Sequence, residues 1–100
     1  MTKRMVDRIT SAFAPVTAPA NLAVTKLVPR VVSLAWSTVQ AASGYRLYRN
    51  GIPLTGPGAT DTSYSDNSVA GHTSYTYTVR AVANNGNEGP ASAPLTVISR

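Results

Sequence analysis

A chain of 100 residues is long enough for one domain with a modest core, and too short to enclose a substrate chamber as well. Hydrophobic residues make up 43% of the chain and charged residues 13%, a balance that excludes disorder throughout. The lack of cysteine excludes disulfide scaffolds, thiolate zinc sites and thiol nucleophiles, while one histidine and four acidic residues leave few candidates for catalysis.

The chain is basic, with nine Lys and Arg against four Asp and Glu, a net charge of +5 and an isoelectric point near 10.1. Such a charge favours anionic partners, among them nucleic acid, a membrane surface or an acidic protein. The basic residues are dispersed along the sequence, however, which is typical of a solubilising surface. No apolar run approaches the roughly 20 residues that a membrane span needs, so we expect no span.

Residues 1–18 differ from the rest and are interpreted as an N-terminal arm that ends in a proline-rich linker. Apolar residues in the arm recur at helical spacing, and basic residues occupy the other face. The apolar set is Met5, Val6, Ile9 and Phe13, and the basic set is Lys3, Arg4 and Arg8. Because so short a helix is marginal in water, the arm either packs on its own domain, anchors the protein to a partner, or is a frayed tail.

The basic start also resembles the opening of a secretory signal, but the apolar run after it is too short and too polar to be one. If residue 1 is the natural start, we therefore expect the product to stay in the cytoplasm unless it leaves inside a larger particle.

From residue 20 onward the apolar period changes from helical spacing to two. Alternation covers residues 22–24, 31–36, 45–48, 75–81 and 95–98, and clusters rich in Gly, Pro, Asn and Ser separate these segments. Asn50-Gly51 supplies a tight hairpin turn. Short strands at regular spacing with no helix among them predict an all-β fold over residues 19–100, a seven-stranded antiparallel two-sheet sandwich of the immunoglobulin-like kind.

Ordered motifs within this body identify a family resemblance. They include Pro19-Ala-Asn-Leu22, Val32-Ser-Leu-Ala-Trp36, Gly44-Tyr-Arg-Leu-Tyr-Arg-Asn-Gly51 and Thr73-Ser-Tyr-Thr-Tyr-Thr-Val-Arg-Ala-Val82. In order and spacing, residues 19–99 resemble a fibronectin type III domain of the type found in bacterial and phage extracellular proteins. The resemblance implies that Tyr75 is a tyrosine-corner residue, whose hydroxyl bonds to upstream backbone, and that Val69 stands where the family usually has leucine.

The predicted core lies between the two sheets. Trp36 occupies the inward parity of its strand and is expected to fill that space rather than to offer a ligand platform. The other expected core residues are Tyr45, Leu47, Tyr64, Tyr77, Val79 and Val97.

Few residues suggest chemistry. Asp61 and Asp66 flank a short strand, where aspartate commonly forms turns with its own backbone, so we interpret them as turn formers rather than as a catalytic pair. His72 has no second ligand nearby in sequence for a metal. We therefore expect no enzymatic activity, no cofactor and no metal.

One surface is a candidate binding face, because neighbouring strands of this fold should bring together outward side chains. These are Arg46, Tyr48, Arg80 and Ile98. Such a set suits an anionic or polar partner, including a polysaccharide, although a solvated sheet face would have a similar composition. No ladder of aromatic residues is available to stack bases, so sequence-specific binding of nucleic acid is not expected. The polar loop at residues 84–90 is interpreted as a flexible hairpin connection.

These observations favour a non-catalytic structural or interaction module. The leading hypothesis, drawn from the resemblance, is a phage virion surface component of the decoration, head or tail type. It would be assembled in the host cytoplasm, anchored by its arm to a capsid or tail protein, and used for weak adhesion to cell-surface polysaccharide. The alternative hypothesis is a spacer or accessory module of a secreted bacterial polysaccharide-degrading enzyme.

Overall fold

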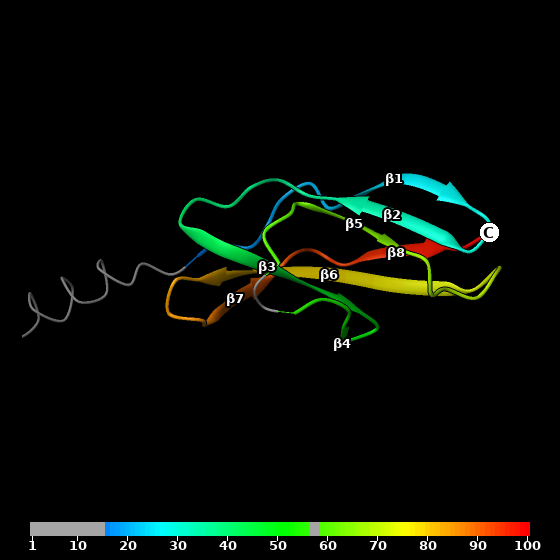
Figure 1. The fold of residues 1–100 in the computed structure, drawn as a ribbon. Coiled ribbons are helices and arrows are strands. Elements are labelled where there is room, and N and C mark those ends of the chain that lie inside the picture. Colours follow the sequence, from blue (N-terminus) through cyan, green and yellow to red (C-terminus); the bar gives the residue numbers. More distant parts are fainter. Residues whose placement is uncertain (1–15, 57–58) are drawn as a thin grey trace, which may run out of the picture.

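The computed structural model describes residues 16–56 and 59–100, and within them all regular structure is β (Figure 1). The predicted all-β class is therefore confirmed. The strands are β1 (Ala23–Val28), β2 (Val31–Ala35), β3 (Ala42–Arg49), β4 (Ile52–Pro53), β5 (Ser63–Asp66), β6 (Ser74–Ala83), β7 (Glu88–Ala91) and β8 (Leu95–Ile98). The predicted arm residues lie outside the described residues, so the anchoring arm stays a prediction.

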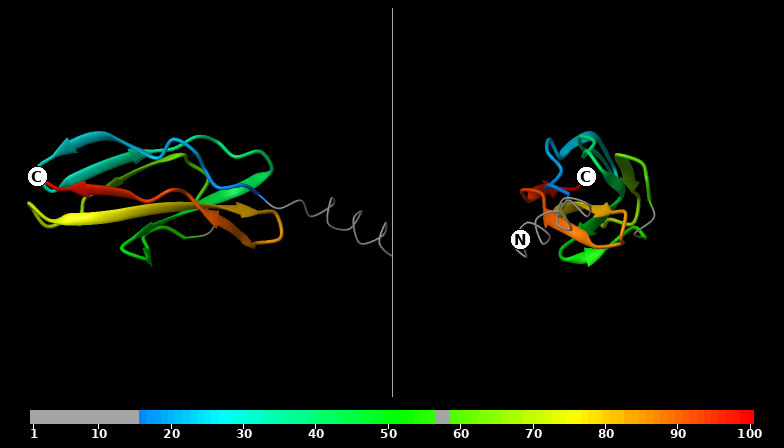
Figure 2. Two further views of the ribbon diagram at one scale, coloured as in Figure 1. Left: turned by 180° about the vertical axis from the view of Figure 1, so that it is seen from behind. Right: turned by 90° about the vertical axis from the view of Figure 1, so that its left-hand side faces the viewer.

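Two antiparallel sheets pack face to face, as Figure 2 shows from behind and from one end. One sheet has the order β1-β2-β5, and the other has the order β4-β3-β6-β7, with β8 also paired to β6. Strands β7 and β8 pair with different stretches of β6, one around Arg80 and the other at Ser74–Tyr77. Between them, the Ser92 N–H donates to the Val79 carbonyl at 2.9 Å. Together β7 and β8 therefore serve as one interrupted strand, consistent with a seven-stranded sandwich.

The turn between β3 and β4 follows from its sequence. Asn50 and Gly51 have φ angles of 52° and 82°, which asparagine tolerates and glycine adopts freely. The Asn50 side-chain oxygen also accepts the Thr76 N–H at 2.9 Å, which ties the turn to β6. The predicted tight hairpin is confirmed.

The core forms from the inward residues of both sheets. Leu47, Tyr77 and Val79 are fully buried, and the Trp36 ring packs edge-on against Tyr45 with centroids 6.0 Å apart. Trp36 is 7% exposed and is thus a core residue, as expected. Tyr64 was expected in the core but is only partly buried, because its strand β5 forms an edge of the three-stranded sheet.

The tyrosine corner has the expected geometry. The Tyr75 hydroxyl accepts the Ala70 N–H at 2.8 Å, five residues upstream. Val69 is 4% exposed and belongs to the core, so the valine fills the position that the family usually gives to leucine. The corner fixes the crossing from β5 to β6.

Packing extends into the predicted linker. Val16 is 4% exposed and joins the hydrophobic core, where it lies against Gly89 of β7. A Cβ atom at Gly89 would come within 2.7 Å of the Val16 carbonyl oxygen, so glycine permits this approach. Strand β7, which Val16 contacts, lies toward one end of the sandwich, and the C-terminus lies at the other (Figures 1 and 2).

Candidate functional site

Three of the four residues predicted for the binding face lie together on the outer surface of the larger sheet. Arg46 of β3 stands directly opposite Arg80 of β6 in the strand register. The Tyr48 ring lies between them, with the Arg46 guanidinium carbon 5.9 Å and the Arg80 guanidinium carbon 6.0 Å from its centroid. These distances are at the outer range of cation–π contact. The sheet register therefore brings two like charges together around one aromatic ring.

Glu88 of β7 completes this cluster. Its carboxylate accepts a hydrogen bond from the Tyr48 hydroxyl and forms an ion pair with Arg46 at 3.2 Å. The Tyr48 hydrogen bond and the arginine charge together lower the pKa of Glu88 despite partial burial. Burial and the same hydrogen bond raise the pKa of Tyr48. The Arg46–Tyr48–Arg80–Glu88 cluster thus ties β3, β6 and β7 together, and Glu88 offsets one of its two positive charges.

The sequence did not single out Glu88, because this residue follows a run of Asn and Gly residues that indicates only a loop. In the structure the turn ends before Glu88, which is the first residue of β7. Only its strand assignment would have shown that its carboxylate faces the arginines.

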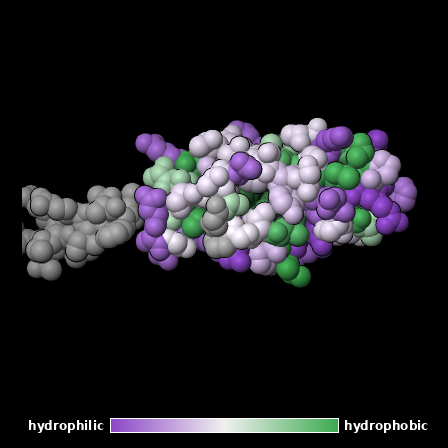
Figure 3. All heavy atoms as spheres, in the orientation of Figure 1, coloured by the Kyte–Doolittle hydropathy of each residue, from purple (hydrophilic) through white to green (hydrophobic). Residues whose placement is uncertain are grey.

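Ile98 lies apart from the cluster. Its register partner on β6 is Ser74, six residues from Arg80, a separation of about 20 Å along a strand. Ile98 is 67% exposed, and the surface seen in Figure 3 has separate apolar patches rather than one continuous apolar area. The predicted face is thus two surfaces, and whether either binds a partner remains a prediction.

A second polar cluster is buried between the sheets. Asp66 of β5 is 1% exposed and accepts hydrogen bonds from Arg49 at 2.9 and 3.2 Å, from the Tyr77 hydroxyl at 2.8 Å and from Ser68. Burial opposes ionisation, but the hydrogen bonds from Ser68, Tyr77 and Arg49 outweigh it, so the pKa of Asp66 is lowered. Burial and the bond to Asp66 also raise the pKa of Tyr77.

Asp66 also accepts the Ser68 N–H at 3.1 Å, which is the turn role predicted from sequence. The sequence did not reveal its second role, the inter-sheet ion pair. Asp61 and His72 are exposed, and the part of the chain that the structure describes has no group of three or more potential metal ligands. Within residues 16–56 and 59–100 there is also no helix long and apolar enough to span a membrane.

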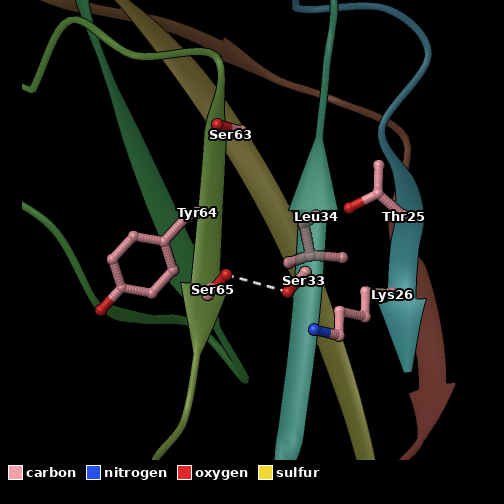
Figure 4. Close-up of a pocket in the computed structure, with 7 residues that line it drawn as sticks. All are labelled: Thr25, Lys26, Ser33, Leu34, Ser63, Tyr64 and Ser65. Carbon is pink, nitrogen blue, oxygen red and sulfur yellow. Dashed lines mark hydrogen bonds between the residues drawn. The ribbon is translucent and has the colours of Figure 1, made fainter. Parts of the chain in front are cut away.

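A shallow hollow lies on the outer face of the smaller sheet (Figure 4). It is lined by Thr25, Lys26, Ser33, Leu34, Ser63, Tyr64 and Ser65. The Ser33 and Ser65 hydroxyls are hydrogen-bonded at 2.9 Å across β2 and β5. The predictions from sequence did not include this surface.

Comparison with known structures identifies the fold. An Fn3-like protein from Clostridium thermocellum superimposes with a TM-score of 0.75 at 26% identity, over 87% of this chain and 96% of that one. The chain has the fold of a fibronectin type III domain. This confirms the resemblance inferred from residues 19–99, although no protein-family model matches the sequence.

Sequence relatives place similar segments inside larger proteins. The domain is 34% identical over 99 residues to a poly(3-hydroxybutyrate) depolymerase of Delftia acidovorans and 40% identical over 83 residues to one of Ralstonia pickettii. It is 40% identical over 85 residues to exoglucanase B of Cellulomonas fimi. These matches cover 91%, 83% and 82% of this chain, but only 20%, 17% and 8% of the respective relatives.

The fibronectin type III domain therefore spans a fifth or less of each of these relatives. Their names favour the alternative hypothesis, a module of a degradative enzyme, and give no support to a virion component.

Proposed function

We propose that this fibronectin type III domain is a non-catalytic spacer or accessory module of an extracellular polymer-degrading enzyme. The observation that carries the proposal is that similar segments form a small part of enzymes named for cleaving different polymers. The predicted substrate class, polysaccharide, is accordingly widened to polymers in general, since poly(3-hydroxybutyrate) is a polyester.

The chemistry of those polymers supports a role outside catalysis. A depolymerase of a polyester breaks ester bonds, whereas an exoglucanase breaks glycosidic bonds, and the two reactions need different catalytic groups. A segment similar in both kinds of enzyme is therefore better suited to a task that they share. Holding other parts of the protein at a distance is such a task.

The fold suits that task. The chain enters the sandwich beside β7, which Val16 contacts, and reaches its C-terminal end at the opposite side, so parts attached at the two ends would be held apart (Figure 1). The partly buried Arg49–Asp66 ion pair joins β3 of one sheet to β5 of the other, which resists sliding between the sheets.

A segment exchange tests the proposal. In the Ralstonia pickettii depolymerase, the similar segment would be replaced by residues 16–100 of this chain or by a flexible Gly/Ser linker of equal length. We expect both chimeras to hydrolyse a soluble short ester equally, and only the domain chimera to retain degradation of solid polymer. Equal loss on solid polymer in both chimeras would contradict the proposal.

A further inference from the structure

The hollow on the outer face of the β1-β2-β5 sheet has an unusual lining. Ser33 lies at the floor of the hollow, 9% exposed and hydrogen-bonded to Ser65, and the exposed Ser63 and Ser65 lie along the neighbouring strand β5. Serine is smaller than the branched and aromatic residues that usually cover a sheet. These three positions therefore leave a depression, and they supply hydroxyl groups that both donate and accept hydrogen bonds.

Positive charge adjoins these hydroxyls. Lys26 is the register partner of Ser33, and Figure 4 shows its amine directed toward Ser33 across the hollow. Arg30 lies in the turn where β1 and β2 meet, at the end of the same sheet and outside the residues that line the hollow. Both residues are exposed, and within residues 16–56 and 59–100 neither forms an ion pair. Asp66 of β5 is turned into the core and paired with Arg49, so it does not neutralise them.

The backbone at Arg30 decides which substitution can remove its charge without strain. Its φ is 62°, a left-handed conformation that disfavours most side chains by about 1 kcal/mol and costs glycine nothing. The cation is thus held at a turn position that glycine would fill with less strain.

The lining lacks a stacking surface. Figure 4 shows the Tyr64 ring directed away from Ser33 and Lys26, on the other side of β5. No aromatic ring of the hollow is therefore placed to stack on the face of a neutral sugar. The serine hydroxyls can bond sugar hydroxyls, and the cationic side chains can bond sugar carboxylates. We propose that the outer face of β1-β2-β5 binds an acidic polysaccharide, with sugar hydroxyls on Ser33, Ser63 and Ser65 and carboxylates on Lys26 and Arg30.

This proposal deepens the proposed function, since it names the class of polymer that the module meets. It is tested on the chain alone, with no enzyme attached. Failure of binding would leave the segment exchange unaffected, and the two proposals can fail separately.

The experiment measures binding of polygalacturonate, with dextran of similar size as the neutral probe. We expect the full chain to bind polygalacturonate and not dextran. The double variant Lys26→Gln/Arg30→Gly should weaken binding by about tenfold, since it removes two charge-assisted contacts and its glycine fits the positive φ. The uncharged change Ser33→Ala/Ser65→Ala should weaken it by about threefold or more, which general charge attraction does not explain.

The variant Arg46→Gln/Arg80→Gln removes the same charge from the other sheet and serves as the comparator. The proposal is overturned if the Lys26/Arg30 variant and the Arg46/Arg80 variant lose polygalacturonate binding to a similar extent. It is also overturned if the chain binds DNA as tightly as polygalacturonate. Either result would show general attraction of anions to a basic chain. No loss in the serine variant would also overturn the proposal. Melting temperatures of all variants, followed by circular dichroism, show whether a loss reflects unfolding instead of the site.

Discussion

Arg49 and Asp66 form an ion pair at 2.9 Å that bridges the two sheets of the sandwich. Arg49 is the last residue of β3 and follows the inward parity of Tyr45 and Leu47. Its guanidinium also lies 5.0 Å from the centre of the Tyr75 ring, so the ion pair and the tyrosine corner form one structure. This contact therefore joins β3, β5 and the start of β6.

Removing one partner should be costly. Removing Asp66 leaves the partly buried Arg49 guanidinium and the buried Tyr77 hydroxyl without their partner, and we expect Asp66→Ala to lower the free energy of unfolding by about 3 kcal/mol. Urea unfolding measures the loss. Asp61→Ala is the matched control, because that carboxylate is exposed, and it should change stability by less than about 0.5 kcal/mol.

A double-mutant cycle separates the pair from its surroundings. If the contact is direct, Arg49→Ala/Asp66→Ala should cost clearly less than the sum of the single changes. Additive losses would mean that the two residues stabilise the fold independently and would contradict a direct ion pair between the sheets.

Acid should weaken the fold through Asp66. Because its folded pKa lies below the ordinary value of 3.8, the ionised carboxylate contributes stability above that pH, and the contribution is lost as pH falls through the folded pKa. Urea unfolding between about pH 7 and about pH 2 should show the steepest loss below about pH 4. Asp66→Asn should flatten that part of the curve. The pKa of Glu88 is lowered as well, so the same curve measured for Glu88→Gln shows how much of the acid dependence comes from Glu88 rather than from Asp66. An unchanged curve for Asp66→Asn would contradict the assignment.

The approach of Val16 to Gly89 gives a steric prediction. Gly89→Ala should destabilise the domain by about 1–3 kcal/mol, because the new methyl group would meet the Val16 carbonyl oxygen at 2.7 Å and its side chain at 2.8 Å. Thermal unfolding checks this. Gly56→Ala is the control, since a Cβ there meets nothing within 4 Å. Equal effects of the two changes would show that Val16 does not pack as described.

The Glu88 carboxylate should matter modestly for stability. Glu88→Gln leaves Arg46 and Arg80 facing each other around Tyr48, and we expect a loss of about 1 kcal/mol at low salt that shrinks as salt is added. Thermal unfolding at two salt concentrations measures it. A loss independent of salt would indicate a packing effect rather than charge repulsion.

The sequence was sufficient to predict the sandwich, because period-two alternation marks the faces of a strand directly. The Asn50-Gly51 turn follows from local geometry, whereas the roles of Tyr75 and Val69 were implied by the family resemblance, and all three have the predicted structure. Such features need only a few neighbouring residues to be specified.

Contacts between distant segments were harder to predict. The Arg49–Asp66 pair joins residues 17 positions apart in different sheets, and its detection requires the register of both strands. The burial of Val16 was not predicted, because the prolines around it indicate extended backbone and say nothing of packing. The hydroxyls of Ser33 and Ser65 meet only through the β2–β5 register, so no local pattern revealed the hollow.

The most direct test of the spacer role is the distance between the two ends of the folded domain. Because the chain has no cysteine, spin labels can be attached at Thr17→Cys and Ile98→Cys, both exposed positions. We expect pulsed electron resonance to give one narrow distance distribution that matches the structure and does not change when the domain is inserted in the depolymerase chimera. A broad distribution, or a short distance, would show that the domain does not hold its ends apart.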